Sequence, residues 1–515
     1  MTDSPNPVNE PGTTVNIDPK KGGRITVRMS RTAQTLTCDR VRFNTDSAVL
    51  QPSGLRVIAA AFQHAKANPG LKLLIASHTD RQGGEEDNQA LSEARAKNVL
   101  HIFAGERKEW IESCKRENKS LQKDVRGLLT WAAEVWNLEG CKPKAITNDP
   151  RDAALDALVS AFKKGFAKRF STNYVETNEA PDIDVTFWGK VYNLYVWTLV
   201  DQLRVDKPAD LAAFLKNVAW VDEGQRSVGC GERFPAKPTA DGQAAAENRR
   251  TEFLFFPANQ EPMQTGFEGN PDPAEYLKGC YAPKRYKFEP IPCPPPLFYG
   301  EPIPEGNVVF VIDISGSMRP TSTTGDRIGS AKRNLNLAIA DLADDARFGV
   351  VAYDTTVRFL WGTGAPKVEV ASEARKSEAR TWVNALAPNG VTNTNQALEA
   401  AFKATNLDEG KPKTVKLLSD GAPTPRAYIA DPKAAGRMTA EEQKKAEAEE
   451  RPKILADVTA WSGGKWRVDT VGLFTKVGET GPLVDFMKDL ATKNGGTFSH
   501  VAVPARPVST TPAAK

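Results

Sequence analysis

The sequence contains few cysteines and histidines and no long apolar run. Six cysteines and four histidines are spread over 515 residues, and no two cysteines have the Cys-x-x-Cys spacing typical of zinc or redox sites. No segment approaches the roughly 20 consecutive apolar residues that cross a bilayer, so we expect no transmembrane segment. The formal net charge is only +4, which predicts no general attraction to nucleic acid.

Length and composition indicate a soluble protein of several domains. Hydrophobic residues make up 40% of the chain and charged residues 26%, as in ordinary globular proteins. The length predicts about three to four structural units. Residues 1–30 and 504–515 show no apolar pattern and predict disordered tails, and the first of these segments lacks the apolar core of a secretory signal.

Three oxygen-bearing side chains follow a short apolar run near the middle of the chain. Val308 to Ile312 predict a buried strand, and Asp313, Ser315 and Ser317 come directly after it. In α/β proteins, ligands bind at the carboxyl edge of the sheet, where these side chains would lie. A hard divalent cation such as Mg²⁺ prefers oxygen ligands of this kind.

Two later segments add two more oxygen ligands. Thr392 lies in a polar loop that opens a predicted helix, and Asp420 follows a second apolar strand, Thr414 to Leu418. The sum is two carboxylates and three hydroxyls at predicted strand ends and loops. An Asp-Gly turn or a Ser-Gly-Ser loop alone is most often only a turn, but the five residues in this order predict a metal site.

These residues resemble the metal-ion-dependent adhesion site of the von Willebrand factor A domain. The family pattern is Asp-x-Ser-x-Ser, then a Thr, then an Asp that is usually followed by Gly, and the match extends over residues 305–503. The resemblance implies a three-layer, doubly wound, Rossmann-like α/β domain. It also implies that Ser315, Ser317 and Thr392 contact Mg²⁺ or Mn²⁺, while Asp313 and Asp420 bind it directly or through water. A partner protein would supply an acidic residue to the open coordination position.

A second polar set lies in the N-terminal half. Leu71 to Ala76 predict a strand that leads into a polar loop containing Asp80, and the helix that follows carries Asn88 and Arg95. A carboxylate and a guanidinium that face one groove suit a zwitterionic amino-acid head group. The alternative is that Asp80 and Arg95 form a salt bridge, which is the commoner role of such a pair.

This second set resembles the OmpA-like peptidoglycan-binding domain. Thr79-Asp80-x-x-Gly83 is followed by Asn88-x-x-Leu-Ser-x-x-Arg95-Ala, and a closing segment contains Arg250. The resemblance implies a two-layer α/β sandwich formed by residues 31–105 and 218–257. It implies that Asp80 and Arg95 contact the peptide stem of peptidoglycan, with Asn88 and Arg250 in support.

Two further segments separate these units. Residues 106–217 interrupt the OmpA-like domain and show helical patterns at 155–170 and 188–203, which predict a helical insertion. Residues 258–304 are dense in proline and glycine and predict a linker.

The combined motifs favour a non-enzymatic adaptor of the bacterial cell envelope. One alternative is a component or accessory of a specialised secretion or contractile assembly. Another is a cell-wall hydrolase in the insertion, which has acids such as Glu134 and Asp156 but no histidine and no diagnostic spacing. The family resemblances imply the envelope or periplasm. The absence of a signal peptide leaves the cytoplasm, or export by a specialised system, open.

Overall fold

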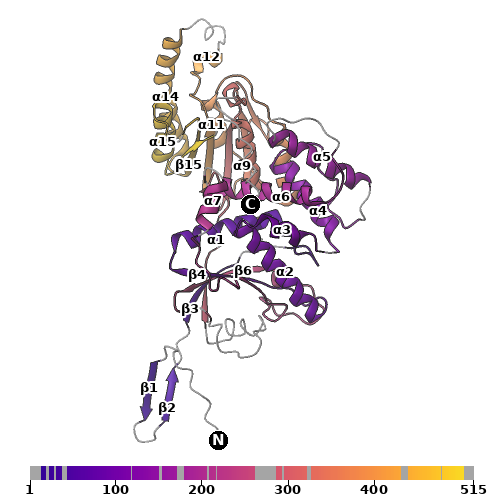
Figure 1. The fold of residues 1–515 in the computed structure, drawn as a ribbon. Helices are drawn as coiled ribbons and strands as arrows, with labels where there is room; N and C mark the ends of the chain where they lie inside the picture. The colour runs from indigo at the N-terminus through magenta and orange to yellow at the C-terminus, as the bar shows by residue number, and fades with distance from the viewer. Residues whose placement is uncertain are drawn as a thin grey trace.

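The computed structural model describes two α/β bodies with a group of helices beside and between them (Figure 1). It describes residues 31–37 and 43–503, together with the backbone of residues 13–18 and 23–27. Within that span the following residues are left out: 117–118, 150–152, 171–178, 204, 206–207, 216, 261, 263–285, 293–294, 322–325, 431–438 and 477. Within the described part, no helix is both long and apolar enough to cross a membrane.

The C-terminal body, here called the A domain, contains a mixed sheet with a parallel centre. Its strand order is β12-β11-β10-β14-β15-β16, and β13 pairs with β11. From β11 to β16 the neighbours run parallel, whereas β12 and β13 pair antiparallel with β11. The strands are β10 (Asn307–Asp313), β11 (Arg347–Tyr353), β12 (Val357–Phe359), β13 (Glu369–Val370), β14 (Lys413–Ser419), β15 (Trp466–Phe474) and β16 (Phe498–Ala502).

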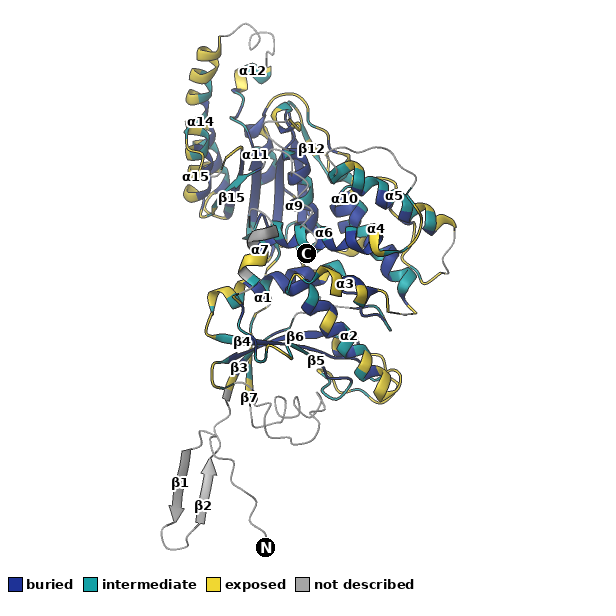
Figure 2. Ribbon diagram, viewed as in Figure 1, coloured by how far each residue is buried: buried dark blue, intermediate teal, exposed yellow. Residues whose placement is uncertain are grey.

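Helices cover both faces of this sheet and bury it in two apolar cores (Figure 2). One core includes α9 (Arg327–Asp341) and α10 (Glu373–Ala385). The other includes α11 (Thr394–Phe402), α14 (Ala440–Ser462) and α15 (Pro482–Lys493). The predicted three-layer, doubly wound fold is confirmed. Two short helices, η3 (Gly316–Met318) and α12 (Arg426–Ala430), follow the ends of β10 and β14.

Helix α9 begins at a well-defined cap. The Asp326 carboxylate accepts a hydrogen bond of 2.9 Å from the backbone N–H of Gly329, which satisfies one of the free donors of the first turn. A Cβ at Gly329 would collide with that carboxylate, so a larger residue here would force the capping side chain to move. An apolar stripe from Ile328 to Leu342 lies in the core. The cap and the stripe together position the N-terminus of α9 beside the loop that follows β10.

The N-terminal body has a five-stranded sheet with helices over one face, as predicted for the OmpA-like fold. Its order is β5-β4-β6-β3-β7. The strands are β3 (Arg31–Leu36), β4 (Leu71–Ser77), β5 (Ser227–Gly229), β6 (Thr251–Pro257) and β7 (Tyr286–Pro290). The helices are α1 (Leu55–Ala67), α2 (Glu85–Phe103) and the short η1 (Pro52–Gly54) and η2 (Ala246–Asn248).

Two segments differ from the sequence prediction. Part of the expected linker, residues 258–304, forms β7, which pairs parallel with β3, and a small hairpin of β8 (Leu297–Phe298) and β9 (Glu301–Pro302). The physical reason is an aromatic contact, because the rings of Tyr286 and Phe288 lie 5.2 and 6.3 Å from that of Phe256.

The second difference lies in the expected N-terminal tail, residues 1–30. There, β1 (Thr13–Asp18) and β2 (Gly23–Val27) pair antiparallel. Both segments are rich in threonine, valine and isoleucine, which favour strands. The expected C-terminal tail, residues 504–515, lies outside the described residues.

The segment 106–217 is helical, as predicted, and shares one core with the N-terminal body. Its helices are α3 (Arg107–Cys114), α4 (Leu121–Val135), α5 (Ala153–Phe170), α6 (Val185–Leu203) and α7 (Pro208–Leu215). Aromatic side chains join them to one another, and the rings of Trp110 and Trp188 lie 6.1 Å apart. Because this core continues into α1 and α2, the insertion packs as an extension of the host domain.

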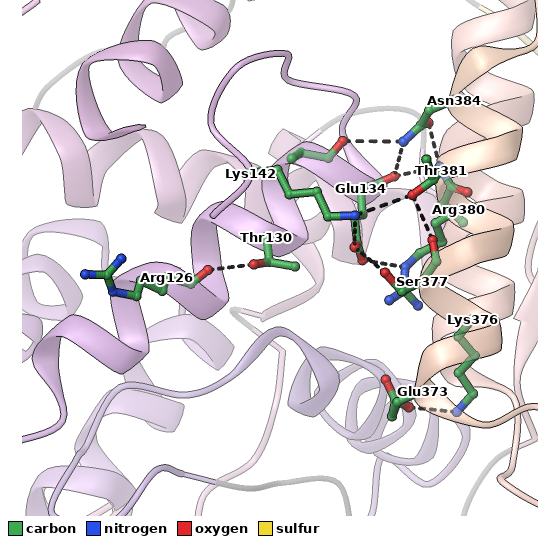
Figure 3. Close-up of polar contacts among 12 residues, drawn as sticks. Arg126, Thr130, Glu134, Lys142, Glu373, Lys376, Ser377, Arg380, Thr381 and Asn384 are labelled. Carbon is green, nitrogen blue, oxygen red and sulfur yellow. Dashed lines mark hydrogen bonds and ion pairs between the residues drawn. The ribbon is translucent and has the colours of Figure 1, made fainter. Parts of the chain in front are cut away.

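The insertion also binds the A domain through one buried carboxylate (Figure 3). Glu134 on α4 accepts hydrogen bonds from Arg380 Nε at 2.7 Å and Ser377 Oγ at 2.9 Å, both on α10. Lys142 Nζ lies 2.8 Å from the same carboxylate. We call these four residues the Glu134 cluster. Glu134 was weighed above as a hydrolase acid, and the structure instead places it in this interface.

Helix α9 is held by the insertion as well. Asn336 donates a hydrogen bond of 2.7 Å to the backbone carbonyl of Glu134, and Arg333 lies 3.6 Å from the Asp201 carboxylate on α6. Asp326 at the cap of α9 lies 3.5 Å from Arg169 on α5. The helix that starts next to the candidate metal site is therefore braced along its length.

Candidate functional site

The predicted metal-site residues meet at the carboxyl edge of the A-domain sheet. Asp313 is the last residue of β10, and Asp420 directly follows β14, its parallel neighbour. Thr392 lies in the loop before α11, and Ser315 and Ser317 lie in the loop after β10. A backbone hydrogen bond of 3.0 Å from Gly316 N–H to the Gly390 carbonyl holds these two loops together.

Hydrogen bonds connect the oxygen atoms of this site. The hydroxyls of Ser315 and Ser317 share a hydrogen bond of 3.0 Å, and Ser317 Oγ donates to Asp420 Oδ1 at 2.7 Å. Asp313 accepts from the backbone N–H of Ser315 at 2.8 Å and from Ser419 Oγ at 2.6 Å. Both carboxylates are therefore held in fixed orientations.

Gly421 shows how closely the hydroxyls approach. A Cβ at this glycine would lie 3.4 Å from Ser317 Oγ and 3.5 Å from Thr392 Oγ1. The two hydroxyls, from loops far apart in sequence, therefore border the same small space. The absent side chain of Gly421 leaves this space open to a small ligand.

The site is buried on one side and open on the other. Asp313 is 0% exposed and Ser315 is 1% exposed, whereas Ser317 is exposed to solvent. Burial raises the pKa of Asp313 to about 7, and the negative charge of Asp420 contributes to the rise. Two carboxylates confined together in this way favour a cation between them.

The donor set fits a hard divalent cation. Carboxylate and hydroxyl oxygens are the ligands that Mg²⁺ and Mn²⁺ prefer. Within the described residues, no group of three or more His, Cys, Asp or Glu side chains is placed to hold a metal. A cation at the A-domain edge would therefore depend on the serine and threonine hydroxyls as well as on the two carboxylates.

Sequence reasoning missed two residues of this site. Ser419 binds Asp313, as described above, and Arg327, the first residue of α9, donates to Asp420 Oδ2 through Nη1. The Asp420 side chain is fully buried and that of Arg327 is 10% exposed. The only sequence signal for Arg327 is its place at the start of the next long helix after β10.

The N-terminal candidate residues each bind a different part of the protein. Asp80 pairs with Arg249 and accepts a hydrogen bond of 3.1 Å from the backbone N–H of Ala245. Asn88 donates to Glu232 at 2.7 Å, and Arg250 donates to Glu252 at 2.8 Å. The weighed alternative of an Asp80–Arg95 salt bridge is not what the structure shows, because the partner of Asp80 is Arg249.

Arg95 lies under the polar loop rather than in an open groove. It is 1% exposed and donates to the backbone carbonyls of Ser47, His78 and Asn44 at 2.9, 3.5 and 3.2 Å. Burial, and to a lesser extent the nearby Arg249, lowers the pKa of Arg95 to about 10, so it is still charged at neutral pH. In this structure Arg95 therefore joins the backbone of residues 44–47 to that of His78, two residues before Asp80.

Comparisons with known proteins identify both domains. Residues 308–422 match the model of the von Willebrand factor type A domain, and residues 42–107 match the OmpA family. Domains of these two kinds are typically binding or adhesion modules rather than enzymes.

Curated relatives match only part of the chain. A stretch of 131 residues is 32% identical to inter-alpha-trypsin inhibitor heavy chain H2 of Mus musculus, which covers 24% of this chain and 13% of that protein. A stretch of 134 residues is 29% identical to heavy chain H6 of Homo sapiens, covering 24% and 10%. The chain thus spans a small fraction of the length of these relatives.

Solved structures with some similarity include three proteins. A von Willebrand factor type A protein from Catenulispora acidiphila is 24% identical with a TM-score of 0.29, covering 39% of each chain. The PilB minor pilin from Streptococcus sanguinis is 17% identical with a TM-score of 0.29, covering 39% of this chain and 59% of that one. Proximal thread matrix protein 1 from the mussel byssus, with a zinc occupied MIDAS motif, is 16% identical with a TM-score of 0.25, covering 39% and 42%.

Proposed function

We propose that this protein is a non-enzymatic adaptor whose A domain binds a protein partner in a metal-dependent manner. The observation that carries the proposal is the convergence of two carboxylates and three hydroxyls at one edge of the A-domain sheet, on the residues predicted for it. Asp313, Ser315, Ser317, Thr392 and Asp420 would hold Mg²⁺ or Mn²⁺.

The arrangement suits binding of an acidic side chain. When bound, the ion supplies a concentrated positive charge and a free coordination position for a carboxylate oxygen of the partner. Ser317 is exposed and lies on the side from which a partner approaches. The buried Asp313 and its bonds to Ser315 and Ser419 hold the floor of the site rigid.

Calorimetric titration of the full-length protein with MnCl₂ and with MgCl₂ tests this function. We expect one site per chain, lost in Asp313→Asn and strongly weakened in Ser317→Ala. Glu399→Gln is the matched control, because Glu399 lies on the neighbouring α11 with a partly exposed side chain that pairs with Lys403. Circular dichroism of each variant confirms folding. Absence of heat with either metal in the wild-type protein contradicts the proposal.

We propose peptidoglycan binding as the function of the N-terminal body. The OmpA family match at 42–107 includes Asp80, Asn88 and Arg95, and Asp80 lies in the loop that follows β4. An adaptor with these two modules would connect the cell wall to a protein partner, with the two contacts reinforcing each other.

Co-sedimentation with purified sacculi tests the N-terminal function. We expect the wild-type protein to be retained and Asp80→Asn to be lost to the supernatant. Asp241→Asn is the control, because Asp241 is exposed and pairs with Arg81 at the surface. Equal retention of the wild type and Asp80→Asn would contradict peptidoglycan binding through this residue. It would not affect the proposed metal-dependent function of the A domain.

A further inference from the structure

Arg327 places a fixed positive charge inside the candidate metal site. Its guanidinium donates to Asp420 Oδ2, while the other carboxylate oxygen of Asp420 accepts from Ser317. The guanidinium of an arginine side chain carries a positive charge. Asp420 therefore has a cationic partner within the protein before any metal ion binds.

The backbone around Arg327 holds it in this place. It is the first residue of α9, directly after the capping Asp326, which also contacts Arg169 of the insertion at 3.5 Å. One turn further on, Ser330 shares a hydrogen bond of 3.0 Å with the Tyr299 hydroxyl. Because α9 is anchored at both points, the Arg327 side chain starts from a fixed position beside Asp420.

Arg327 changes the net charge of the metal-loaded site. Asp313 and Asp420 contribute two negative charges and Arg327 one positive charge. With a doubly charged ion bound, the site has a net charge of plus one, whereas the same site without Arg327 would be neutral. A single carboxylate from a partner restores neutrality only when Arg327 is present.

We propose that Arg327 sets the ligand preference of the A domain by lowering its affinity for the metal ion alone and raising the affinity of the loaded site for a carboxylate. This inference rests on the proposed metal-dependent function. It assigns to Arg327 a role in selecting an anionic side chain, Asp or Glu, over a neutral one such as Gln. The effect is electrostatic and acts through Asp420, so Arg327 is a positioning and selectivity residue.

Arg327→Gln tests the proposal because it removes the charge and keeps a hydrogen-bond donor near Asp420. We expect Mn²⁺ affinity, measured by electron paramagnetic resonance, to rise by about tenfold or more, since a nearby charge shifts ionic equilibria by about that factor. We expect the Mn²⁺-loaded variant to bind the probe acetyl-Gly-Gly-Glu-Gly-Gly-amide less tightly than the wild type does. The peptide with Gln in place of Glu should bind to both proteins with equal affinity.

The two measurements must change in opposite directions. A merely structural role for Arg327 would weaken metal and peptide binding together, and that result overturns the proposal, as does an unchanged metal affinity. Arg327→Lys keeps the charge and should resemble the wild type in both assays. Arg327→Met is a second neutral variant if Arg327→Gln does not fold. A wild-type protein that binds no Mn²⁺ refutes the proposed function itself, which is a separate outcome.

Discussion

The Glu134 cluster offers a sharp test of how the insertion binds the A domain. The Glu134 side chain is 4% exposed and its partner Arg380 is 9% exposed, so the pair is buried, whereas Lys142 is 41% exposed. Glu134→Gln removes the negative charge but keeps the side-chain shape. The backbone carbonyl of Glu134 still accepts from Asn336 and Asn384 at 2.7 and 2.8 Å.

The expected magnitude follows from burial. Removing one partner of a buried ion pair costs about 3–5 kcal/mol because the other charge is left without compensation. The exposed Lys142 adds at most about 1 kcal/mol. Ser377 donates equally well to an amide oxygen, so its bond is retained. We therefore expect Glu134→Gln to destabilise the interface by about 3 kcal/mol.

A double-mutant cycle with Arg380→Gln isolates the pair. Because several domains unfold together or separately, the readout is hydrogen exchange of the backbone amides of α4 and α10, which reports opening of this interface. We expect a coupling energy of about 2–3 kcal/mol between Glu134 and Arg380.

The matched control cycle uses the solvent-accessible pair Glu399–Lys403, whose charged atoms lie 2.6 Å apart at the C-terminal end of α11. Exposed pairs at this spacing contribute about 0.3–0.5 kcal/mol. A coupling energy for Glu134 and Arg380 no larger than that of the control pair would refute the reasoning, because it would mean that burial adds nothing to this contact.

Three further predictions concern the pH dependence of the Glu134 contact and the substitution of two glycines, Gly421 and Gly329. Burial alone would raise the pKa of Glu134, but Arg380, Lys142 and Ser377 outweigh it and hold that pKa below its usual value. The stabilisation of the interface by Glu134 is therefore complete above the ordinary pKa of a glutamate, and it is lost as the pH falls through the lowered value. Hydrogen exchange of the α10 amides, measured from pH 7 to pH 3, would show this loss as faster exchange. Gly421→Val should abolish Mn²⁺ binding in calorimetry without changing the circular dichroism spectrum, because its methyl groups would fill the space between the hydroxyls of the site. Gly329→Ala should destabilise the A domain by about 1 kcal/mol or more in urea denaturation, because its Cβ displaces the carboxylate that caps α9.

The grouping of the candidate site residues could be predicted, because it follows from the local pattern of apolar and polar residues along the chain. A short apolar run that ends in polar residues indicates a buried strand, and parallel neighbours bring their carboxyl ends to one edge. Asp313 and Asp420 come together for that reason alone. The pattern of Ser315, Ser317 and Thr392 around them is also readable as a motif.

The Arg327–Asp420 contact could not be predicted in this way. The two residues are 93 positions apart, and their meeting depends on the exact start and tilt of α9. An arginine on the first turn of a helix is also more often exposed than buried. A polar residue at a strand end, such as Asp420, is easier to recognise in a sequence than the distant arginine that pairs with it.

The N-terminal candidates show a second limit. The strand, loop and helix that carry Asp80 and Arg95 could be predicted, but the direction of each side chain could not. The Arg95 side chain points toward three backbone carbonyls. Asp80 instead forms an ion pair with Arg249, the neighbour of the predicted Arg250. Strand β7 was missed because proline-rich composition around it outweighed a short alternation of aromatic residues.

Anomalous diffraction from crystals grown with MnCl₂ would locate directly any metal ion bound at the A-domain edge. We expect one strong manganese peak at the edge of the A-domain sheet, within bonding distance of the oxygens of Ser315, Ser317 and Thr392. A peak elsewhere on the protein, or no peak at manganese concentrations that saturate comparable sites, would contradict it.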